Sequence, residues 1–410
     1  MKPEHVRTIQ SNPGASSTTQ THSCIRFSGK LLLPALLALA VPLNAQPWTW
    51  TGEGDDNEWT NAQNWDQASA PALNTGNNVV QEVIVHSGDI MATGTRDIGR
   101  NIPGSTQTVT GGNIIITGGH RYGVLTGGGG TGFHSGGSIL SGGIFQLGVQ
   151  NGTSATYYLS GDASLTASHF AIASGGADTV ATMNQSGGTF NTTGASGSFI
   201  GHLGNGTYNL SGGTLTRTGA NISIGTGATA TGDLNQTGGL IDLVNASLSV
   251  SAMNGGVGTY SISNGTINAV DLGIGEGIKG TMNVGENATI SFSGDLNLHA
   301  NGEINFIFGE SGISTMSFGG AGDIDPNAEI SIVGTGFMAV AEQTFQLIST
   351  STFSATPDIT LVGFAQEASY LWNETTGQFS VTVIPEPSHM ALIAGCILLT
   401  LVIVRRRNRN

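Results

Sequence analysis

The chain has 410 residues, of which 64 are glycine and only 10% are charged, a composition unlike that of an ordinary globular enzyme. The region 46–384 carries five basic residues against 25 acidic ones, a formal charge of −20. This charge argues against nucleic-acid binding through phosphate neutralisation, so we expect no nucleic-acid partner. Both cysteines, Cys24 and Cys396, lie outside this region, which excludes a disulfide framework within it.

The N-terminal segment has the pattern of a secretory signal peptide. Two basic residues precede the apolar run Leu31–Leu43, and the small residue Ala45 stands before Gln46. This order of charge, apolar core and small residue is typical of a signal that is removed during export. We therefore expect residues 1–45 to be cleaved off between Ala45 and Gln46. The alternative is a buried core helix.

Residues 46–105 are predicted to form an N-terminal cap. The stretch WTWTGEGDDNEWTNAQNW holds four of the five tryptophans, Trp48, Trp50, Trp59 and Trp65. Indole rings either plug the open apolar end of a repetitive fold or offer faces on which sugars stack. We favour the plug and keep the four tryptophans as candidate glycan contacts. The stretch also resembles the N-terminal opening of autotransporter-like β-helix proteins.

Residues 106–302 contain an internal repeat. Six stretches align at intervals of 26, 25, 26, 26 and 22 residues, among them ATMNQSGGTF, GTYNLSGGTL and GDLNQTGGLI. Within each unit the apolar residues recur at a spacing of two, which indicates strands. Three columns of apolar residues result. The first is Tyr157, Met183, Tyr208, Leu234, Tyr260 and Met282; the second is Leu165, Phe190, Leu215, Ile241, Ile267 and Ile290; the third is Ile172, Ile200, Ile224, Val250, Ile274 and Leu298.

These columns predict an all-β fold, a right-handed parallel β-helix (β-solenoid) with one coil of about 25 residues per unit. Glycines between the first two strands of each unit let the chain turn a tight corner. Disorder is the alternative, but a disordered tract has no reason to keep three columns in phase. Residues 303–384 alternate as strands and are predicted to cap the other end, either by continuing the helix or as a separate β domain.

The last segment, 385–410, carries a second membrane signal. An uncharged run predicts a transmembrane helix over 389–404, and the arginines that follow keep that end cytoplasmic. These arginines are Arg405, Arg406, Arg407 and Arg409. The bulk of the chain is therefore expected on the outer face.

The sequence Pro385-Glu386-Pro387, followed by the apolar run and the arginines, resembles the PEP-CTERM sorting tail of bacteria that make an extracellular polymeric matrix. The resemblance implies recognition by a membrane-embedded exosortase that cuts near the Pro-Glu-Pro motif. Expected partners are then the exosortase, the secretion machinery and, transiently, the inner membrane. A permanently anchored protein is the alternative.

The region 46–384 offers no convincing catalytic pattern, and we predict no catalytic residue, no cofactor and no metal site. Its histidines fall in different registers of the repeat. A β-helical polysaccharide lyase or glycosidase is the main alternative, and it needs positioned carboxylates and, for a lyase, a base. The available carboxylates occupy unlike positions: Asp162, Asp233, Asp242, Asp271, Glu276 and Asp295. Arg217 and Lys279 are the only basic residues between residue 150 and the tail.

The sequence therefore predicts an exported protein of the cell surface or extracellular matrix with a structural or adhesive role. Extracellular polysaccharide is a candidate partner. A carbohydrate-binding protein without catalysis is a further alternative.

Overall fold

The computed structural model describes residues 46–71, 81–252, 255–338, 341–364 and 367–384. Within them the chain is all-β and forms a parallel β-solenoid of the right-handed type with about 25 residues per coil. The helical element described is a single 3₁₀ turn, η1, at Ala62–Asn64. The predicted signal peptide, Pro-Glu-Pro motif, transmembrane helix and arginine tail lie outside the described residues.

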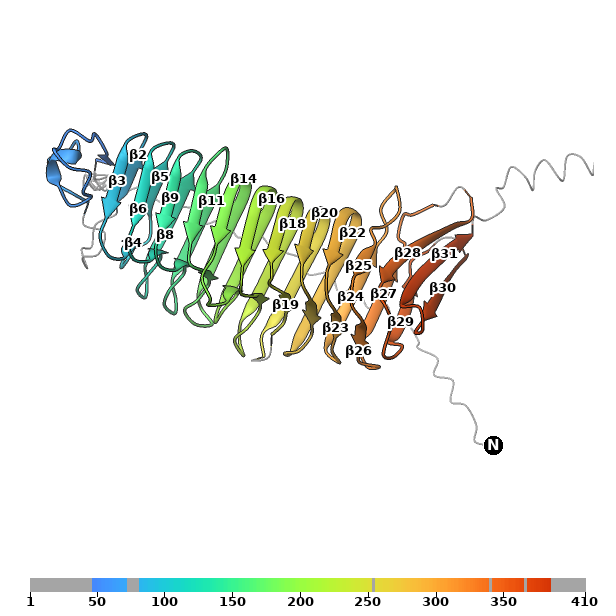
Figure 1. Cartoon of the computed structure of the whole chain (residues 1–410). Helices are drawn as coiled ribbons and strands as arrows, with labels where there is room; N and C mark the ends of the chain where they lie inside the picture. The colour runs from blue at the N-terminus through green and yellow to red at the C-terminus, as the bar shows by residue number, and fades with distance from the viewer. Residues whose placement is uncertain (1–45, 72–80, 253–254, 339–340, 365–366, 385–410) are drawn as a thin grey trace, which may run out of the picture. The chain divides into compact units, whose positions relative to one another are not determined.

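The larger of two sheets has 21 strands and supplies two sides of each coil (Figure 1). Its strands in the first four coils are β2 (Glu82–Val85), β3 (Asp89–Ala92), β5 (Ser105–Val109), β6 (Asn113–Ile116), β8 (Gly129–His134), β9 (Ser138–Ser141), β11 (Ser154–Leu159) and β12 (Ser164–Ala167). In the next five coils the two sides merge into single strands, β14 (Val180–Thr192), β16 (Asn205–Thr218), β18 (Thr231–Val244), β20 (Val257–Ala269) and β22 (Lys279–Phe292). Each of these coils therefore has two strands, although its three apolar columns predict three short strands.

The remaining strands of this sheet lie at its two ends. They are β1 (Trp48–Thr49), β24 (Gly302–Ile307), β25 (Met316–Phe318), β27 (Glu329–Val333), β28 (Gln343–Ser349), β29 (Asp358–Val362), β30 (Glu367–Asn373) and β31 (Gln378–Ile384). The smaller sheet supplies the third side of each coil through ten parallel strands, β4 (Arg96–Ile98), β7 (His120–Tyr122), β10 (Phe145–Leu147), β13 (Phe170–Ile172), β15 (Ser198–Ile200), β17 (Ile222–Ile224), β19 (Leu248–Val250), β21 (Leu272–Ile274), β23 (Leu296–Leu298) and β26 (Gly322–Ile324).

The corners within the long strands β14, β16, β18 and β20 each contain a glycine with a positive φ. Gly213, in the corner of β16, has a φ of +80°. A Cβ atom placed there would lie 2.4 Å from the carbonyl oxygen of Gly188 in the preceding coil. The corner therefore needs glycine both for its backbone conformation and for the close approach of the coil beneath.

The three predicted apolar columns are confirmed, and they fill the interior. Members of the first column lie directly opposite one another in adjacent coils, as in the pairs Tyr157–Met183 and Tyr208–Leu234. The second and third columns are in register in the same way, and every member of the three columns is buried. Each coil thus shields the apolar side chains of its neighbours from water, and burial continues from coil to coil.

The interior also contains amides that the apolar columns do not predict. Gln236 is buried, and its Oε1 accepts a hydrogen bond of 2.6 Å from the Tyr260 hydroxyl in the next coil. Gln185 accepts in the same way from Tyr208. The glutamine Nε2 groups donate to backbone carbonyls, Gln236 to Thr266 at 2.9 Å and Gln185 to Thr214 at 3.0 Å. Both of these glutamines thereby find partners in the coil that follows them.

The solenoid is longer than the predicted 106–302. On the N-terminal side, β2, β3 and β4 already form a coil that pairs in parallel with β5, β6 and β7. The predicted cap 46–105 therefore includes a complete coil, formed by β2, β3 and β4. On the C-terminal side, β24, β25, β26, β27 and β29 continue the parallel pairing.

Antiparallel strands end the stack at the C-terminal side. β31 pairs antiparallel with both β28 and β30. The sequence left open whether residues 303–384 continue the helix or form a separate β domain. They first continue the helix and then form an antiparallel cap. Such a cap covers the apolar end of the last coil and occupies strand edges that would otherwise be open to pairing.

Candidate functional site

The tryptophan-rich segment covers the first coil. Backbone bonds join it to two sides of that coil, from Trp50 N–H to the Ile84 carbonyl at 3.0 Å and from Trp59 N–H to the Met91 carbonyl at 2.8 Å. Trp50, Trp59 and Trp65 are buried, and Trp48 is half-buried. The Trp65 ring packs edge-on against Trp50 and Trp59, with centroids 5.1 and 4.8 Å apart.

The indole N–H groups are also used within the cap. Trp59 Nε1 donates to the Pro71 carbonyl at 3.3 Å, and Trp65 Nε1 donates to the Trp59 carbonyl at 2.8 Å. Three of the four candidate glycan contacts therefore have ring faces covered by protein. This arrangement fits a plug, and a glycan-contact role for the four tryptophans stays a prediction that their burial does not favour.

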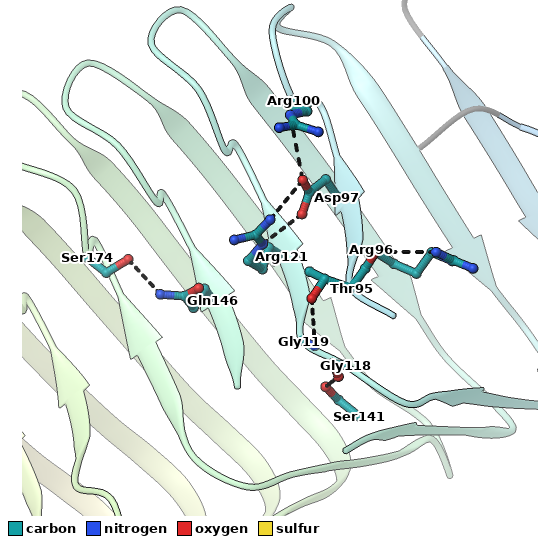
Figure 2. Close-up of polar contacts among 10 residues, drawn as sticks. All are labelled: Thr95, Arg96, Asp97, Arg100, Gly118, Gly119, Arg121, Ser141, Gln146 and Ser174. Carbon is teal, nitrogen blue, oxygen red and sulfur yellow. Dashed lines mark hydrogen bonds and ion pairs between the residues drawn. The ribbon is translucent and has the colours of Figure 1, made fainter. Parts of the chain in front are cut away.

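Three arginines lie in the first two coils of the solenoid. The Asp97 carboxylate on β4 is buried, and Arg121 on β7 donates to both of its oxygens, from Nε at 2.7 Å and from Nη2 at 2.9 Å. Arg100 Nε lies 3.8 Å from Asp97 Oδ2. Figure 2 shows the two guanidinium groups on different sides of this carboxylate. A bidentate pair of this kind compensates a buried charge and ties two coils together.

Arg96 contacts the tryptophan-rich segment. Its guanidinium lies 5.9 Å from the centre of the Trp59 ring, and its Nη1 donates to the Thr95 carbonyl at 3.3 Å. Burial lowers the pKa of Arg96, while the charges of Glu58 and Asp97 act in the opposite direction. We interpret the three arginines as structural, because their described contacts are to the protein itself.

Arg217, one of two bases considered for a lyase, is fully buried. Its guanidinium donates to the carbonyls of Ala220 at 3.0 Å, Ser168 at 2.9 Å and Gly194 at 2.8 Å, and also to that of Ser196. These carbonyls belong to three successive coils. Arg217 therefore acts as an internal staple, and a substrate in solution does not reach it.

Lys279, the other base, lines a shallow pocket of about 190 Å³ together with Glu303 and Glu329. Its Nζ lies 2.9 Å from Glu303 Oε2, and this hydrogen bond raises the pKa of Lys279. Burial alone would raise the pKa of Glu303, but hydrogen bonds from Lys279, Asn305 and Thr281 lower it overall. Glu303 and Glu329 lie opposite each other in adjacent coils.

This group of one base and two carboxylates was not predicted from the sequence. The repeat continues past residue 302 and contains the signal, because Gly302-Glu303-Ile304-Asn305 repeats the pattern of Gly280-Thr281-Met282-Asn283.

Of the carboxylates that were considered as candidate catalytic groups, Asp271 and Asp295 lie next to each other in adjacent coils. Both accept backbone N–H bonds there, Asp271 from Asp295 at 2.8 Å and Asp295 from Ala321 at 2.7 Å.

Two histidines are buried in the interior of the early coils. His120 Nε2 lies 2.9 Å from Gln107 Oε1, which also accepts from the Tyr122 hydroxyl at 2.6 Å. His134 Nδ1 lies 3.0 Å from the Tyr157 hydroxyl. Burial lowers the pKa of His120 to about 3 and that of His134 to about 4. Both imidazoles are neutral at pH 7.

No group of three His, Cys, Asp or Glu side chains among the described residues is placed to hold a metal ion. No helix in the same part of the chain is long and apolar enough to span a membrane. Comparison with protein-family models, with curated proteins and with solved structures found no match.

Proposed function

We propose that this chain is an exported bacterial protein with a structural or adhesive role at the cell surface or in the extracellular matrix. Its delivery signals are the predicted signal peptide 1–45 and the tail 385–410, which resembles PEP-CTERM tails. An exosortase cuts the chain near Pro385-Glu386-Pro387 after the secretion machinery has passed it through the inner membrane. The mature part is then the solenoid with its two caps.

The observation that supports a scaffold most directly is the continuous interior. Buried residues follow one another in register from Val83 in the first coil to Ile330 in β27. The backbone of each coil is hydrogen-bonded to that of the next, so the stack resists bending and the separation of single coils. Capped ends and acidic charge keep such a stack from joining others edge to edge.

Export and processing are tested by fractionating cells that express three forms of the full gene. These are the native chain, a chain lacking 385–410, and a chain in which Pro385, Glu386 and Pro387 are all alanine. We expect the native product to be shortened and found at the surface or in the medium, and the alanine form to stay in the membrane at full length. Equal mass and distribution of all three forms would contradict the proposal, and a native chain that stays full-length in the membrane would indicate a permanent anchor.

A carbohydrate-active enzyme is the second candidate, and the pocket at Lys279, Glu303 and Glu329 is the observation that favours it. A pair of carboxylates beside a base is the equipment that glycosidases and lyases use. Neutral and acidic polysaccharides are incubated with the protein, and reducing ends and unsaturated products are measured. Activity that disappears in both Glu303→Gln and Glu329→Gln would establish this candidate, and no released product from any polysaccharide would remove it.

A further inference from the structure

Two exposed aromatic rings stand together on the outer face of the larger sheet. Phe133 on β8 and Tyr158 on β11 lie directly opposite each other in adjacent coils. Their rings are parallel within 3°, their centroids are 5.1 Å apart, and their exposed fractions are 43% and 42%. Rings stacked in this way cover one face of each other, so the second face of Tyr158 is directed to the next coil. The residue opposite Tyr158 in that coil is the much smaller Asn184.

Asparagines continue the same column over the following coils. Asn184, Asn209 and Asn235 lie opposite one another, and each donates to the previous one, Asn209 Nδ2 to Asn184 Oδ1 at 2.9 Å and Asn235 Nδ2 to Asn209 Oδ1 at 3.0 Å. A carboxamide has two N–H donors and two acceptor lone pairs, so these bonds use only part of its capacity. The ladder therefore holds a row of amides in one orientation, with donors and acceptors left over at intervals of about 4.8 Å.

The surroundings of this column are uncharged over its first four coils. A parallel column of threonines flanks it, with Thr131, Thr156, Thr182 and Thr207 in register. The charged members of that column lie beyond these four coils, Glu82 two coils before Thr131 and Asp233 one coil after Thr207. The region 46–384 as a whole carries a formal charge of −20. Anionic polymers are therefore repelled, whereas a neutral ligand meets hydroxyls, amides and an aromatic face.

We propose that Phe133, Tyr158, Asn184, Asn209 and Asn235 form a binding strip for an extended, neutral polysaccharide that runs across the coils. One sugar ring packs the C–H groups of its apolar face on the free face of Tyr158. The following sugars place hydroxyls, which both donate and accept, on the amide ladder. The rise of one coil is comparable to the length of one sugar unit, so successive units meet successive asparagines. This inference deepens the adhesive part of the proposed function.

The test is affinity electrophoresis of the full-length protein in gels that contain hydroxyethyl cellulose, an extended neutral polymer, or polygalacturonate, an anionic one. Tyr158→Asn gives coil four the residue that the next three coils already have at this position, so the fold accommodates it. Asn209→Ala interrupts the ladder, and Leu371→Ala removes an exposed apolar side chain in the C-terminal cap as the matched control. We expect retardation by hydroxyethyl cellulose that weakens roughly tenfold in Tyr158→Asn, which is about 1.4 kcal/mol, and also in Asn209→Ala, but not in Leu371→Ala.

Several outcomes would overturn the inference. They are no retardation of the native protein by the neutral polymer, equal loss in all three variants, or stronger retardation by polygalacturonate. Size-exclusion chromatography of the same proteins tests another occupant, because a native dimer that Tyr158→Asn dissociates would assign the strip to a second copy of the chain. The measurement uses purified protein, so its failure is separate from a failure of export or processing.

Discussion

The Tyr260 hydroxyl donates to the buried Oε1 of Gln236 across two adjacent coils, at 2.6 Å. Tyr208 and Gln185 repeat this contact two coils earlier. In both pairs the glutamine lies in one coil and the tyrosine in the next, so the interior alternates with a period of two coils, although the backbone repeats with every coil. A buried amide that lost its partner would keep the full cost of leaving water.

The first prediction concerns this pair. Tyr260→Phe removes the donor to Gln236 and is expected to destabilise the fold by about 1–3 kcal/mol, because a buried acceptor is left unsatisfied. Gln236→Leu leaves the Tyr260 hydroxyl unsatisfied at a similar cost. The double variant makes the site apolar, as in the coils of Leu210 and Ile262, so we expect it to cost less than the two single changes together. Urea unfolding followed by far-UV circular dichroism measures this, and strict additivity would contradict the coupling.

The second prediction separates backbone conformation from crowding at the corners. Gly213→Ala and Gly219→Ala both place a side chain on a residue with a φ near +80°, which costs about 1–2 kcal/mol. A Cβ at Gly219 meets nothing within 4 Å, whereas at Gly213 it lies 2.4 Å from the Gly188 carbonyl oxygen. We expect Gly213→Ala to lower the urea midpoint much more than Gly219→Ala. Equal shifts of the urea midpoint in the two variants would show that the neighbouring coil moves to make room for the added side chain.

The third prediction is a loss of stability in acid. The pKa is depressed to about 3 for His120 and about 4 for His134, from an ordinary value near 6.5. Below about pH 6.5 these histidines therefore bind protons in the unfolded chain but stay neutral in the folded chain. The two buried, neutral imidazoles contribute their full stability above about pH 6.5. This contribution falls as the pH drops and is lost once the pH passes their pKa values in the folded chain, near 4 and 3.

This acid sensitivity is measured as the thermal midpoint between pH 7 and pH 4. We expect a flatter profile for the double variant His120→Gln/His134→Gln than for the native protein, since glutamine has no proton to take up. The variant is compared with itself across pH, so its lower stability at pH 7 does not obscure the slope. An unchanged slope would place the acid response in other groups.

The fourth prediction compares two ion pairs. Arg121→Leu leaves the buried Asp97 carboxylate without its bidentate partner and is expected to cost about 3 kcal/mol. Lys279→Leu breaks a pair in which the lysine side chain is more than half exposed, and we expect a change below about 1 kcal/mol. High salt should reduce the effect of Lys279→Leu further. A larger effect of Lys279→Leu would show that the exposed pair, and not the buried one, holds neighbouring coils together.

The sequence predicted the part of the fold that depends on repeated apolar residues. The columns through Tyr208 and Leu215 are visible because burial on one face of a strand imposes a spacing of two, and the stack imposes the longer period. The buried glutamines were missed, although Gln185 and Gln236 share the inward parity of Met183 and Leu234. A polar residue at an inward position is permitted only by a specific partner, and that partner lies in another coil.

The candidate sites were less predictable for a related reason. The contact between Lys279 and Glu303 depends on a coil beyond the last clear repeat, and the stacking of Phe133 on Tyr158 depends on the register of two coils that share little sequence. The first coil was missed because its strands Glu82–Val85 and Asp89–Ala92 share little sequence with the later units. Register in a solenoid decides which side chains become neighbours, and it follows from the whole stack rather than from any one unit.

The pairing of Gln185 with Tyr208, and of Gln236 with Tyr260, limits how a gene of this kind can grow or shrink. Removing the coil of Tyr208 alone would leave the buried Gln185 amide without its hydroxyl partner, whereas deleting both partners together leaves no buried glutamine unpaired by this loss. Recombination between repeats is therefore tolerated here when it adds or removes two coils at a time. The unit that can be gained or lost is two coils, twice the repeat seen in the sequence.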